Sequence, residues 1–307
     1  MTGWLESALA SVRPGAAIES VARPTEGNRK ETLIVTLADG ERLVVQRSAD
    51  PDAFAAETAL LCAIADRTTV PVPSVVESGR IDGHGYRVTA WIDGGNLHGQ
   101  FVSLAPDDRE RIARRFGRVL AELHGTFEFD RFGPVVAENG RLRATGTAAA
   151  ERWFRARADR AIDALPDAFS DLKARIRDAV RGASPSDPTP RLFAWDLRPG
   201  NAIVDGGSIA AFPDWGEPLA APPGLAVAKV EHLVADWYRL DREPLRSAFR
   251  DGYAEVRPLP EMRRADRVLA VVSAAVDSDG VVTRPGYPER TGDDAVAFHR
   301  QRLAESL

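Results

Sequence analysis

The hydrophobic pattern of the chain becomes mainly helical after Asp93-Gly94-Gly95. Before this point, short apolar runs are separated by turn-forming residues, which is typical of β-strands. After it, apolar residues recur at spacings of three and four, which is typical of amphipathic helices. The change predicts an α+β fold with two lobes: a strand-rich lobe over residues 1–92 and a larger, mainly helical lobe over residues 93–307.

The smaller lobe is predicted to contain a five-stranded antiparallel sheet and one helix that crosses it, in the order β-β-β-α-β-β. Asp39-Gly40 separates two apolar runs and is a strong hairpin signal. Asp50 or Asp52 can cap the helix that follows. Three strands are expected within 17–47, the helix at 50–66, and the last two strands at 74–79 and 85–92.

The larger lobe is predicted to be built from helices around one short hairpin. Two strand-like pieces at 201–204 and 209–212 are joined by Asp205-Gly206-Gly207, which predicts that hairpin. Beyond the helix that contains Leu120, helical periods recur at 150–165, 168–181, 225–240, 244–256 and 261–276.

The composition favours small-molecule chemistry over nucleic-acid or membrane binding. With 45 acidic and 40 basic residues the net charge is −5, so no overall positive field attracts a polyanion. The sequence has no apolar run of about 18 residues and no N-terminal secretion signal, so we expect a cytoplasmic protein. The single cysteine, Cys62, lies in an apolar run and is expected to be a buried structural thiol.

Three polar residues around the predicted hairpin, Asp196, Asn201 and Asp214, are candidate catalytic and metal-binding residues. The stretch 195–201 reads Trp-Asp-Leu-Arg-Pro-Gly-Asn, and Asp214-Trp215-Gly216 follows the hairpin. Two antiparallel strands return the chain to its start, so Asp214 can lie beside Asn201. Phosphoryl transfer needs a carboxylate for the acceptor hydroxyl and oxygen ligands for Mg²⁺. The alternative is a surface turn, since these residues are turn formers, but a turn does not explain the second acidic motif.

These motifs resemble those of the kinase superfamily, most closely its aminoglycoside phosphotransferase and choline kinase-like branch. That branch has a H-G-D-x-x-P-G-N-like loop, a hairpin, and an I-D-W or D-F-G-like element, which correspond here to residues 194–201 and 213–216. Leu123-His124 is similar to the Leu-His ending of a helix in the family. The resemblance spans roughly residues 21–237. It implies a protein-kinase-like two-lobed fold with the nucleotide in the cleft between the lobes.

The resemblance implies a role for each matching residue. Asp196 would be the catalytic carboxylate, and Asn201 and Asp214 would bind Mg²⁺. ATP or GTP would donate its γ-phosphoryl group to a hydroxyl of a small metabolite or an aminoglycoside-like acceptor. The nucleotide side would comprise the loop residues Gly27 and Asn28, the strand residues Gln46 and Arg47, the ion-pairing Glu57, and the interlobe residues Thr89, Ala90 and Trp91, whose backbone would bind adenine.

The chain also departs from the family pattern. Ala194 replaces the motif histidine, and the strand expected to carry a phosphate-binding lysine has none. We expect Arg47, or else Gln46, to replace that lysine and Glu57 to reach Arg47; the alternative is an arginine that only faces solvent. These departures keep open a nucleotide-binding pseudoenzyme or regulatory module of the same fold. A protein kinase is disfavoured, because no Ala-Pro-Glu element follows Asp214. The sequence does not identify the acceptor substrate.

Overall fold

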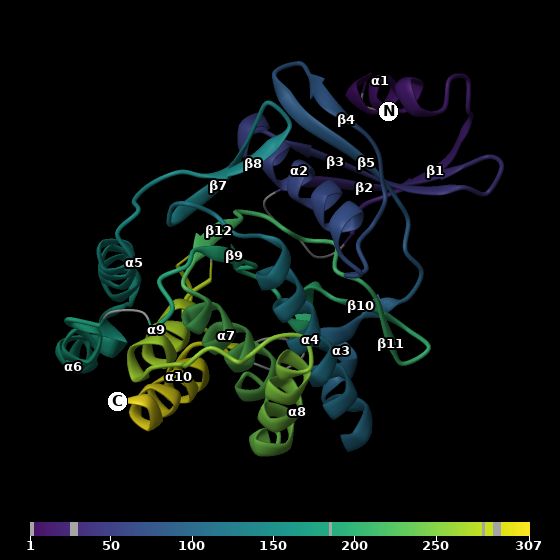
Figure 1. The fold of residues 1–307 in the computed structure, drawn as a ribbon. Coiled ribbons are helices and arrows are strands. Elements are labelled where there is room, and N and C mark those ends of the chain that lie inside the picture. Colours follow the sequence, from purple (N-terminus) through teal and green to yellow (C-terminus); the bar gives the residue numbers. More distant parts are fainter. Residues whose placement is uncertain (1–2, 25–29, 184–185, 278–279, 285–289) are drawn as a thin grey trace.

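The computed structural model describes residues 3–24, 30–183, 186–277, 280–284 and 290–307 (Figure 1). A small lobe built on a five-stranded sheet adjoins a larger, mainly helical lobe. The predicted two-lobed α+β architecture is confirmed. In the part of the chain that the structure describes, no helix is both long enough and apolar enough to cross a membrane.

The sheet of the small lobe is antiparallel throughout, in the order β1-β2-β3-β5-β4. Gly40 and Gly83 have φ values of 88° and 77°, so both Asp-Gly pairs form turns in the left-handed region that hairpins require. The strands are β1 (Ile18–Ala22), β2 (Glu31–Leu37), β3 (Arg42–Ser48), β4 (Val75–Ile81) and β5 (His84–Ala90).

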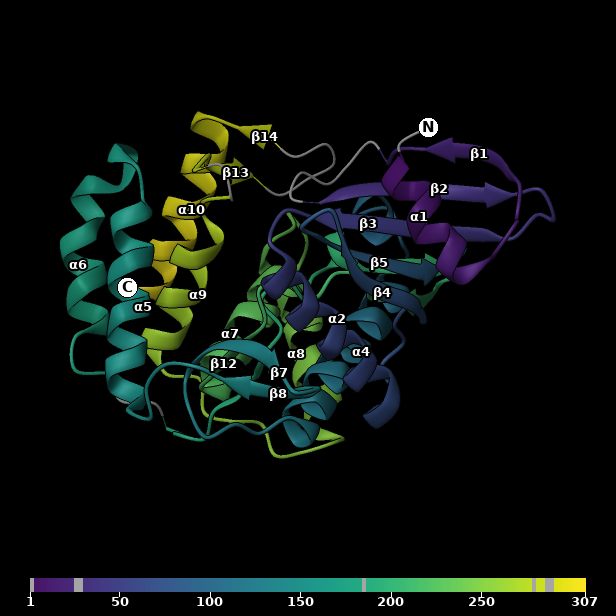
Figure 2. The ribbon, with the colours of Figure 1, turned by 90° about the horizontal axis from the view of Figure 1, so that it is seen from above.

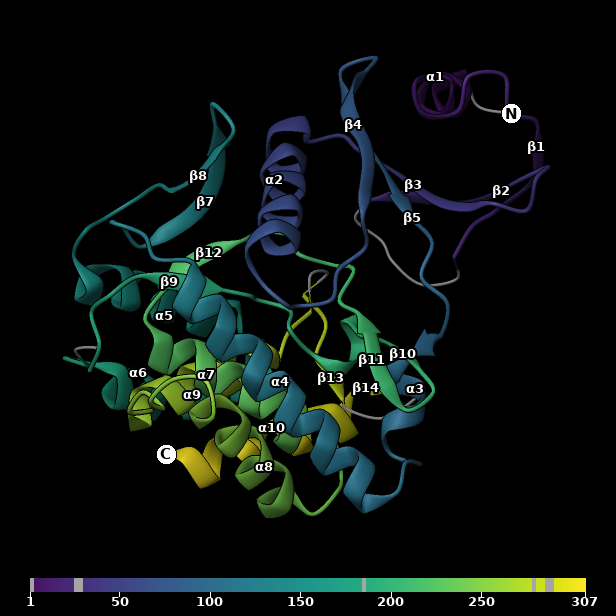
Figure 3. The same ribbon diagram turned by 45° about the vertical axis from the view of Figure 1, so that its right-hand side comes forward.

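The two faces of this sheet meet different helices. One face packs apolar residues of β2 and β3 against Trp4 and Leu5 of α1 (Gly3–Val12). The other face turns toward α2 (Pro51–Arg67), which crosses the sheet as predicted (Figure 3). Successive side chains of a strand point to opposite faces, so the position of a residue within its strand decides which helix it contacts.

Helix α2 connects the two lobes. The carboxylate of Asp50 accepts a hydrogen bond from the Ala53 amide at 3.0 Å and caps the helix as predicted. Farther along, Leu60, Leu61 and Ile64 belong to the main core of the larger lobe. Cys62 is only half-buried, less than expected, and that burial raises the pKa of its thiol.

The larger lobe is organised around two helices in close contact. The chain leaves β5 through β6 (Gly95–Asn96) and α3 (Leu97–Phe101) and enters α4 (Pro106–Thr126), which packs against α8 (Arg242–Ala254). A Cβ atom at Gly117 would lie 2.0 Å from the Phe249 carbonyl oxygen, and one at Gly252 would lie 2.0 Å from that of Arg114. Glycine at both positions therefore lets the two backbones touch.

A second core lies on the side of the lobe away from the sheet, where α5, α6, α9 and α10 run side by side (Figure 2). The expected helix at 225–240 is divided: its α-helical part ends at Glu231 and a buried π-helical turn, η3, continues it to Asp236. The helices are α5 (Ala150–Ala164), α6 (Ser170–Val180), α7 (Pro223–Glu231), η3 (His232–Asp236), α9 (Arg264–Ala274) and α10 (Asp293–Ser306), with the 3₁₀ turn η1 (Asp167–Phe169) ahead of α6.

Several short strands and the last helix, α10, were not predicted. A four-stranded sheet in the order β8-β7-β12-β9 lies between the two lobes, and its β7-β8 hairpin packs beside α2 (Figure 3). Strands of this length show too little alternation to be recognised from sequence. They are β7 (Gly133–Glu138), β8 (Arg141–Ala144), β9 (Arg191–Phe193) and β12 (Leu219–Ala221); another pair is β13 (Thr283–Arg284) and β14 (Arg290–Thr291).

Candidate active site

The loop with the three polar residues is held between a strand and a hairpin. It follows β9, passes through the 3₁₀ turn η2 (Pro199–Asn201), and continues into β10 (Ile203–Asp205) and β11 (Ser208–Ala211). The two strands pair antiparallel, with Ile203 opposite Ala211, and so form the predicted hairpin. Buried Ala202 and Phe212 anchor its two ends in the main core. The hairpin therefore returns Asp214 to the neighbourhood of Asn201.

Asp196, Asn201 and Asp214 line the same cavity. The Asn201 amide nitrogen donates a 3.0 Å hydrogen bond to the Asp196 backbone carbonyl. This bond orients the side chain, and no described residue donates to the Asn201 amide oxygen. The loop thus offers the carboxylate of Asp196. The amide oxygen of Asn201 and the carboxylate of Asp214 line the same cavity.

Lys30, which sequence reasoning missed, lies beside Asp214. Its ammonium group is 3.1 Å from the Asp214 Oδ1 atom and 2.6 Å from the Glu57 Oε1 atom. Desolvation by the surrounding protein raises the pKa of Asp214, but the charge and hydrogen bond of Lys30 outweigh it, so this pKa lies below its usual value. One signal was available: Lys30 is the only lysine in the first 172 residues.

Glu57 is buried between two cations. It accepts hydrogen bonds from Lys30 at 2.6 Å and from Arg87 at 2.9 Å, and only 3% of its surface is exposed. Arg87, itself 1% exposed, also donates to the Gln46 amide oxygen at 2.6 Å. Of the two strand residues predicted here, Gln46 therefore joins the Glu57 cluster through Arg87.

The expected pair between Arg47 and Glu57 is not formed. Arg47 instead donates to Glu31 at 2.8 Å and stacks on Trp4, with 4.7 Å between its guanidinium carbon and the ring centroid. The reason is the strand period: Arg47 shares the face of Leu43 and Val45, which pack toward α1, whereas Glu57 lies on α2 at the opposite face. The prediction that Arg47 replaces the lysine as the partner of Glu57 was wrong.

The interlobe residues are also partly engaged. Thr89 is buried, the Ala90 amide donates to the Ser74 carbonyl at 3.0 Å, and the Trp91 amide donates to the Arg42 carbonyl at 3.2 Å. The Trp91 ring is covered by the Arg42 guanidinium, 3.9 Å from its centroid. Both amide donors are thus used within the sheet, which leaves only carbonyl groups or later linker residues to contact a base. Gly27 and Asn28 lie outside the described residues.

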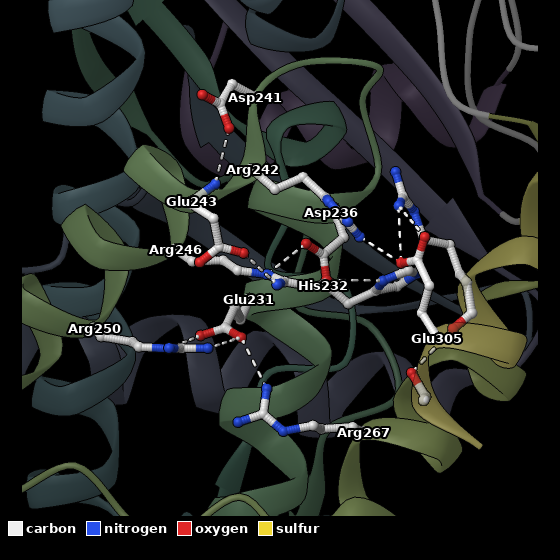
Figure 4. A network of polar contacts seen from close by, with 12 residues as sticks. Glu231, His232, Asp236, Asp241, Arg242, Glu243, Arg246, Arg250, Arg267 and Glu305 are labelled. Carbon is white, nitrogen blue, oxygen red and sulfur yellow. Dashed lines mark hydrogen bonds and ion pairs between the residues drawn. The ribbon is translucent and has the colours of Figure 1, made fainter.

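A network of acids and arginines supports the helices behind the site (Figure 4). Asp236, on η3, accepts two hydrogen bonds of 2.8 Å from Arg246 on α8. Glu231, at the end of α7, accepts bonds of 2.6 and 2.9 Å from Arg250. Burial raises the pKa of Asp236, but the nearby His232 ring, 3.6 Å away, and the hydrogen bonds from Arg246 lower it to about 2. The network ties η3 and α7 to α8, and its acids are occupied by arginines.

The sequence of this chain matches a known protein family. Residues 20–267 match the model of the phosphotransferase enzyme family. The chain belongs to this family. The enzyme class predicted from the sequence, and the resemblance on which it rests, are confirmed. No sequence of a curated protein matches the chain.

Solved structures of other phosphotransferases and of a putative kinase have a similar fold. The crystal structure of aminoglycoside phosphotransferase APH(4)-Ia is 16% identical, with a TM-score of 0.70, over 100% of this chain and 98% of that one. A thermostable mutant of it, in ternary complex with AMP-PNP and hygromycin B, is 17% identical, with a TM-score of 0.68 over 98% and 97%. A putative fructosamine-3-kinase from Haemophilus somnus 129PT is 14% identical, with a TM-score of 0.62 over 99% and 96%.

Proposed function

We propose that this phosphotransferase moves the γ-phosphoryl group of a nucleoside triphosphate, ATP or GTP, to a hydroxyl group of a small molecule. The observation that carries the proposal is that Asp196, Asn201 and Asp214 line one cavity, and that Lys30, which is paired with Glu57, contacts Asp214. The structure of the APH(4)-Ia mutant in ternary complex with AMP-PNP and hygromycin B supports a site that takes a nucleotide analogue and a second small molecule together.

The donor set fits Mg²⁺. Asp214 and Asn201 offer hard oxygen atoms, and Mg²⁺ commonly binds one or two carboxylate or amide oxygens together with nucleotide phosphates and water. The described residues contain no group of three or more His, Cys, Asp or Glu side chains able to hold a metal by themselves. A site completed by the phosphates therefore fits better than a cage made only of protein. When bound, Mg²⁺ would neutralise charge on the transferring group.

Asp196 is assigned the role of the catalytic carboxylate that acts on the acceptor hydroxyl. Its carboxylate orients the acceptor hydroxyl and takes its proton as the hydroxyl oxygen forms a bond to the γ-phosphorus. The bond from that phosphorus to the β-γ bridging oxygen breaks, and the nucleoside diphosphate leaves with the electron pair. Asn201 helps to hold this geometry, because its amide nitrogen binds the backbone of Asp196 at 3.0 Å.

Lys30 is assigned the role of the missing strand lysine. It is anchored by buried Glu57 and lies next to Asp214, so its charge is directed toward the place where phosphates would meet the metal ligands. A cation held by a buried carboxylate is pre-oriented and loses little freedom on binding an anion. The lysine thus comes from the residue just before β2 in place of β3, which removes the main reason to favour a pseudoenzyme.

The test uses the native protein. We expect calorimetry to show AMP-PNP binding that is at least tenfold tighter with Mg²⁺ than with EDTA, since the phosphates and metal ligands share the ion. We expect radiolabel from γ-³²P-ATP or γ-³²P-GTP to appear on an acceptor in a panel of sugars, sugar acids, amino alcohols and aminoglycosides. Equal nucleotide affinity with and without Mg²⁺, together with no hydrolysis and no transfer, would establish the pseudoenzyme instead.

A further inference from the structure

A buried lysine lies directly behind the catalytic loop. Lys229, on α7, is 2% exposed, and its ammonium group rests against the ring of Trp195, the residue that precedes Asp196. Among the described residues, no oxygen accepts a hydrogen bond from it and no carboxylate lies within ion-pair distance. A ring face attracts a cation but cannot accept its three N–H groups. Lys229 is therefore an ammonium group inside the protein without a hydrogen-bonding counterpart among these residues.

A second cation contacts the same tryptophan. The guanidinium carbon of Arg157, on α5, lies 4.0 Å from the centroid of the Trp195 ring. Its Nε atom is buried without a hydrogen-bond partner among the described residues, and burial lowers the pKa of this group to about 10. Two helices far apart in sequence thus bring cations to one side chain. Trp195 itself stands where the family motif has glycine, so its ring occupies a position that glycine would leave open.

The charges around the loop do not balance. Burial lowers the pKa of Lys229 well below its usual value; the Asp196 carboxylate favours the charged form, while Arg157 and Arg198 oppose it. Two acids face these three cations: Asp196, which is assigned to the acceptor hydroxyl, and Glu217, whose charge favours the charged form of Arg157. Buried cations without partners destabilise a fold, and they are found where a ligand supplies the opposite charge.

We propose that the acceptor carries an anionic group, a carboxylate or a phosphate, which binds to Lys229 and Arg157 beside Trp195 while the hydroxyl of the same molecule faces Asp196. This inference rests on the proposed phosphotransferase function and names its substrate class. Trp195, whose ring contacts both cations, lines the same cavity as Asp196, so a small molecule in this cavity lies next to both residues. A cationic aminoglycoside bound beside Trp195 would meet the like charges of Lys229 and Arg157.

The first experiment measures anion binding without knowledge of the acceptor. Sodium sulfate is titrated into the full chain saturated with Mg²⁺ and AMP-PNP, at constant ionic strength, and binding is followed by tryptophan fluorescence and calorimetry. We expect Lys229→Met and Arg157→Met each to weaken sulfate binding about tenfold or more, as the loss of a charged hydrogen bond predicts. Arg155→Met is the matched control, because Arg155 is an exposed arginine on α5, the helix of Arg157. This variant should bind sulfate like the native protein.

The second experiment measures transfer from γ-³²P-ATP to four probes: D-gluconate, D-glucose 6-phosphate, D-glucose and kanamycin. We expect one of the two anions to be the preferred acceptor, which also separates a carboxylate from a phosphate group. We expect Lys229→Arg, which keeps the charge, to retain more of that activity than Lys229→Met. Unchanged sulfate affinity in both methionine variants, or preferred transfer to kanamycin or glucose, would overturn the proposal.

Failure of this inference and failure of the proposed function are distinguishable. Mg²⁺-dependent AMP-PNP binding and slow nucleotide hydrolysis need no acceptor, and they report the proposed function alone. The same nucleotide affinity also shows that each variant is folded. A protein that binds the Mg²⁺ nucleotide normally but has no anion site disproves only the inference, whereas one without nucleotide binding disproves the proposed function.

Discussion

Replacing Lys229 by methionine should stabilise the protein while it removes the proposed anion site. Methionine keeps the length of the side chain and removes its charge, and its thioether packs well against the Trp195 ring. In the native protein the ammonium group is 2% exposed and no described residue accepts its hydrogen bonds. Its desolvation is therefore offset only by the aromatic ring and by the more distant charge of Asp196.

The size of the effect follows from burial. An unsatisfied buried polar group costs about 1–3 kcal/mol in proteins, and a cation on an aromatic ring regains about 0.5–2 kcal/mol. We expect Lys229→Met to raise the free energy of unfolding by about 0.5–1 kcal/mol at neutral pH, which is the difference between the lower ends and between the upper ends of these two ranges. This gain would accompany a loss of anion binding, as is common where a strained site serves function.

The pH dependence gives the sharper test. Burial first of all lowers the pKa of Lys229 in the folded protein below its usual value of 10.5, so the unfolded chain binds more protons between the two values. Native stability should rise with pH across that window, by at most about 1.4 kcal/mol per pH unit, and the methionine variant should lack this rise. The advantage of the variant is thus largest below the folded pKa and is lost as pH approaches 10.5.

Urea unfolding of the native protein and of Lys229→Met from pH 6 to pH 10 measures this difference. Subtracting one curve of unfolding free energy against pH from the other removes the contribution of the groups that titrate in both proteins. Lys229→Arg is the control, because it keeps a cation at the site. A variant that is less stable than the native protein at neutral pH, with a difference that does not change with pH, would refute the reasoning and show that Lys229 is a satisfied structural cation.

Three further variants test the site. Asp196→Asn should lower turnover by about 10²-fold or more with little change in nucleotide affinity, because an acid/base group acts in the transition state; a loss under tenfold in a coupled assay would contradict its role. Asp214→Ala should weaken nucleotide binding with Mg²⁺ but not with EDTA, as calorimetry can show. Lys30→Met should raise the KM for nucleotide about tenfold or more, whereas Arg47→Met, which alters only the pair with Glu31 and Trp4, should leave it unchanged.

The sequence alone determined the features that depend on neighbouring residues. The strand and helix periods on either side of Asp93 predicted the two lobes, because those periods are local properties of the chain. The loop at 195–201 and the hairpin before Asp214 were recognised for the same reason: turn-forming residues and short strands act over a few positions. The capping of α2 by Asp50 was also predicted, because a cap involves residues only a few positions apart.

Tertiary structure alone decided which charges meet. Lys30 contacts Glu57 and Asp214 across separations of 27 and 184 residues, and no local pattern encodes such a contact. The sequence placed Arg47 and Gln46 next to each other, but the alternation of β3 sends them to opposite faces of the sheet, and only the position of α2 shows which face matters. In the same way, two distant helices bring Arg157 and Lys229 to Trp195, because packing pairs faces rather than sequence neighbours.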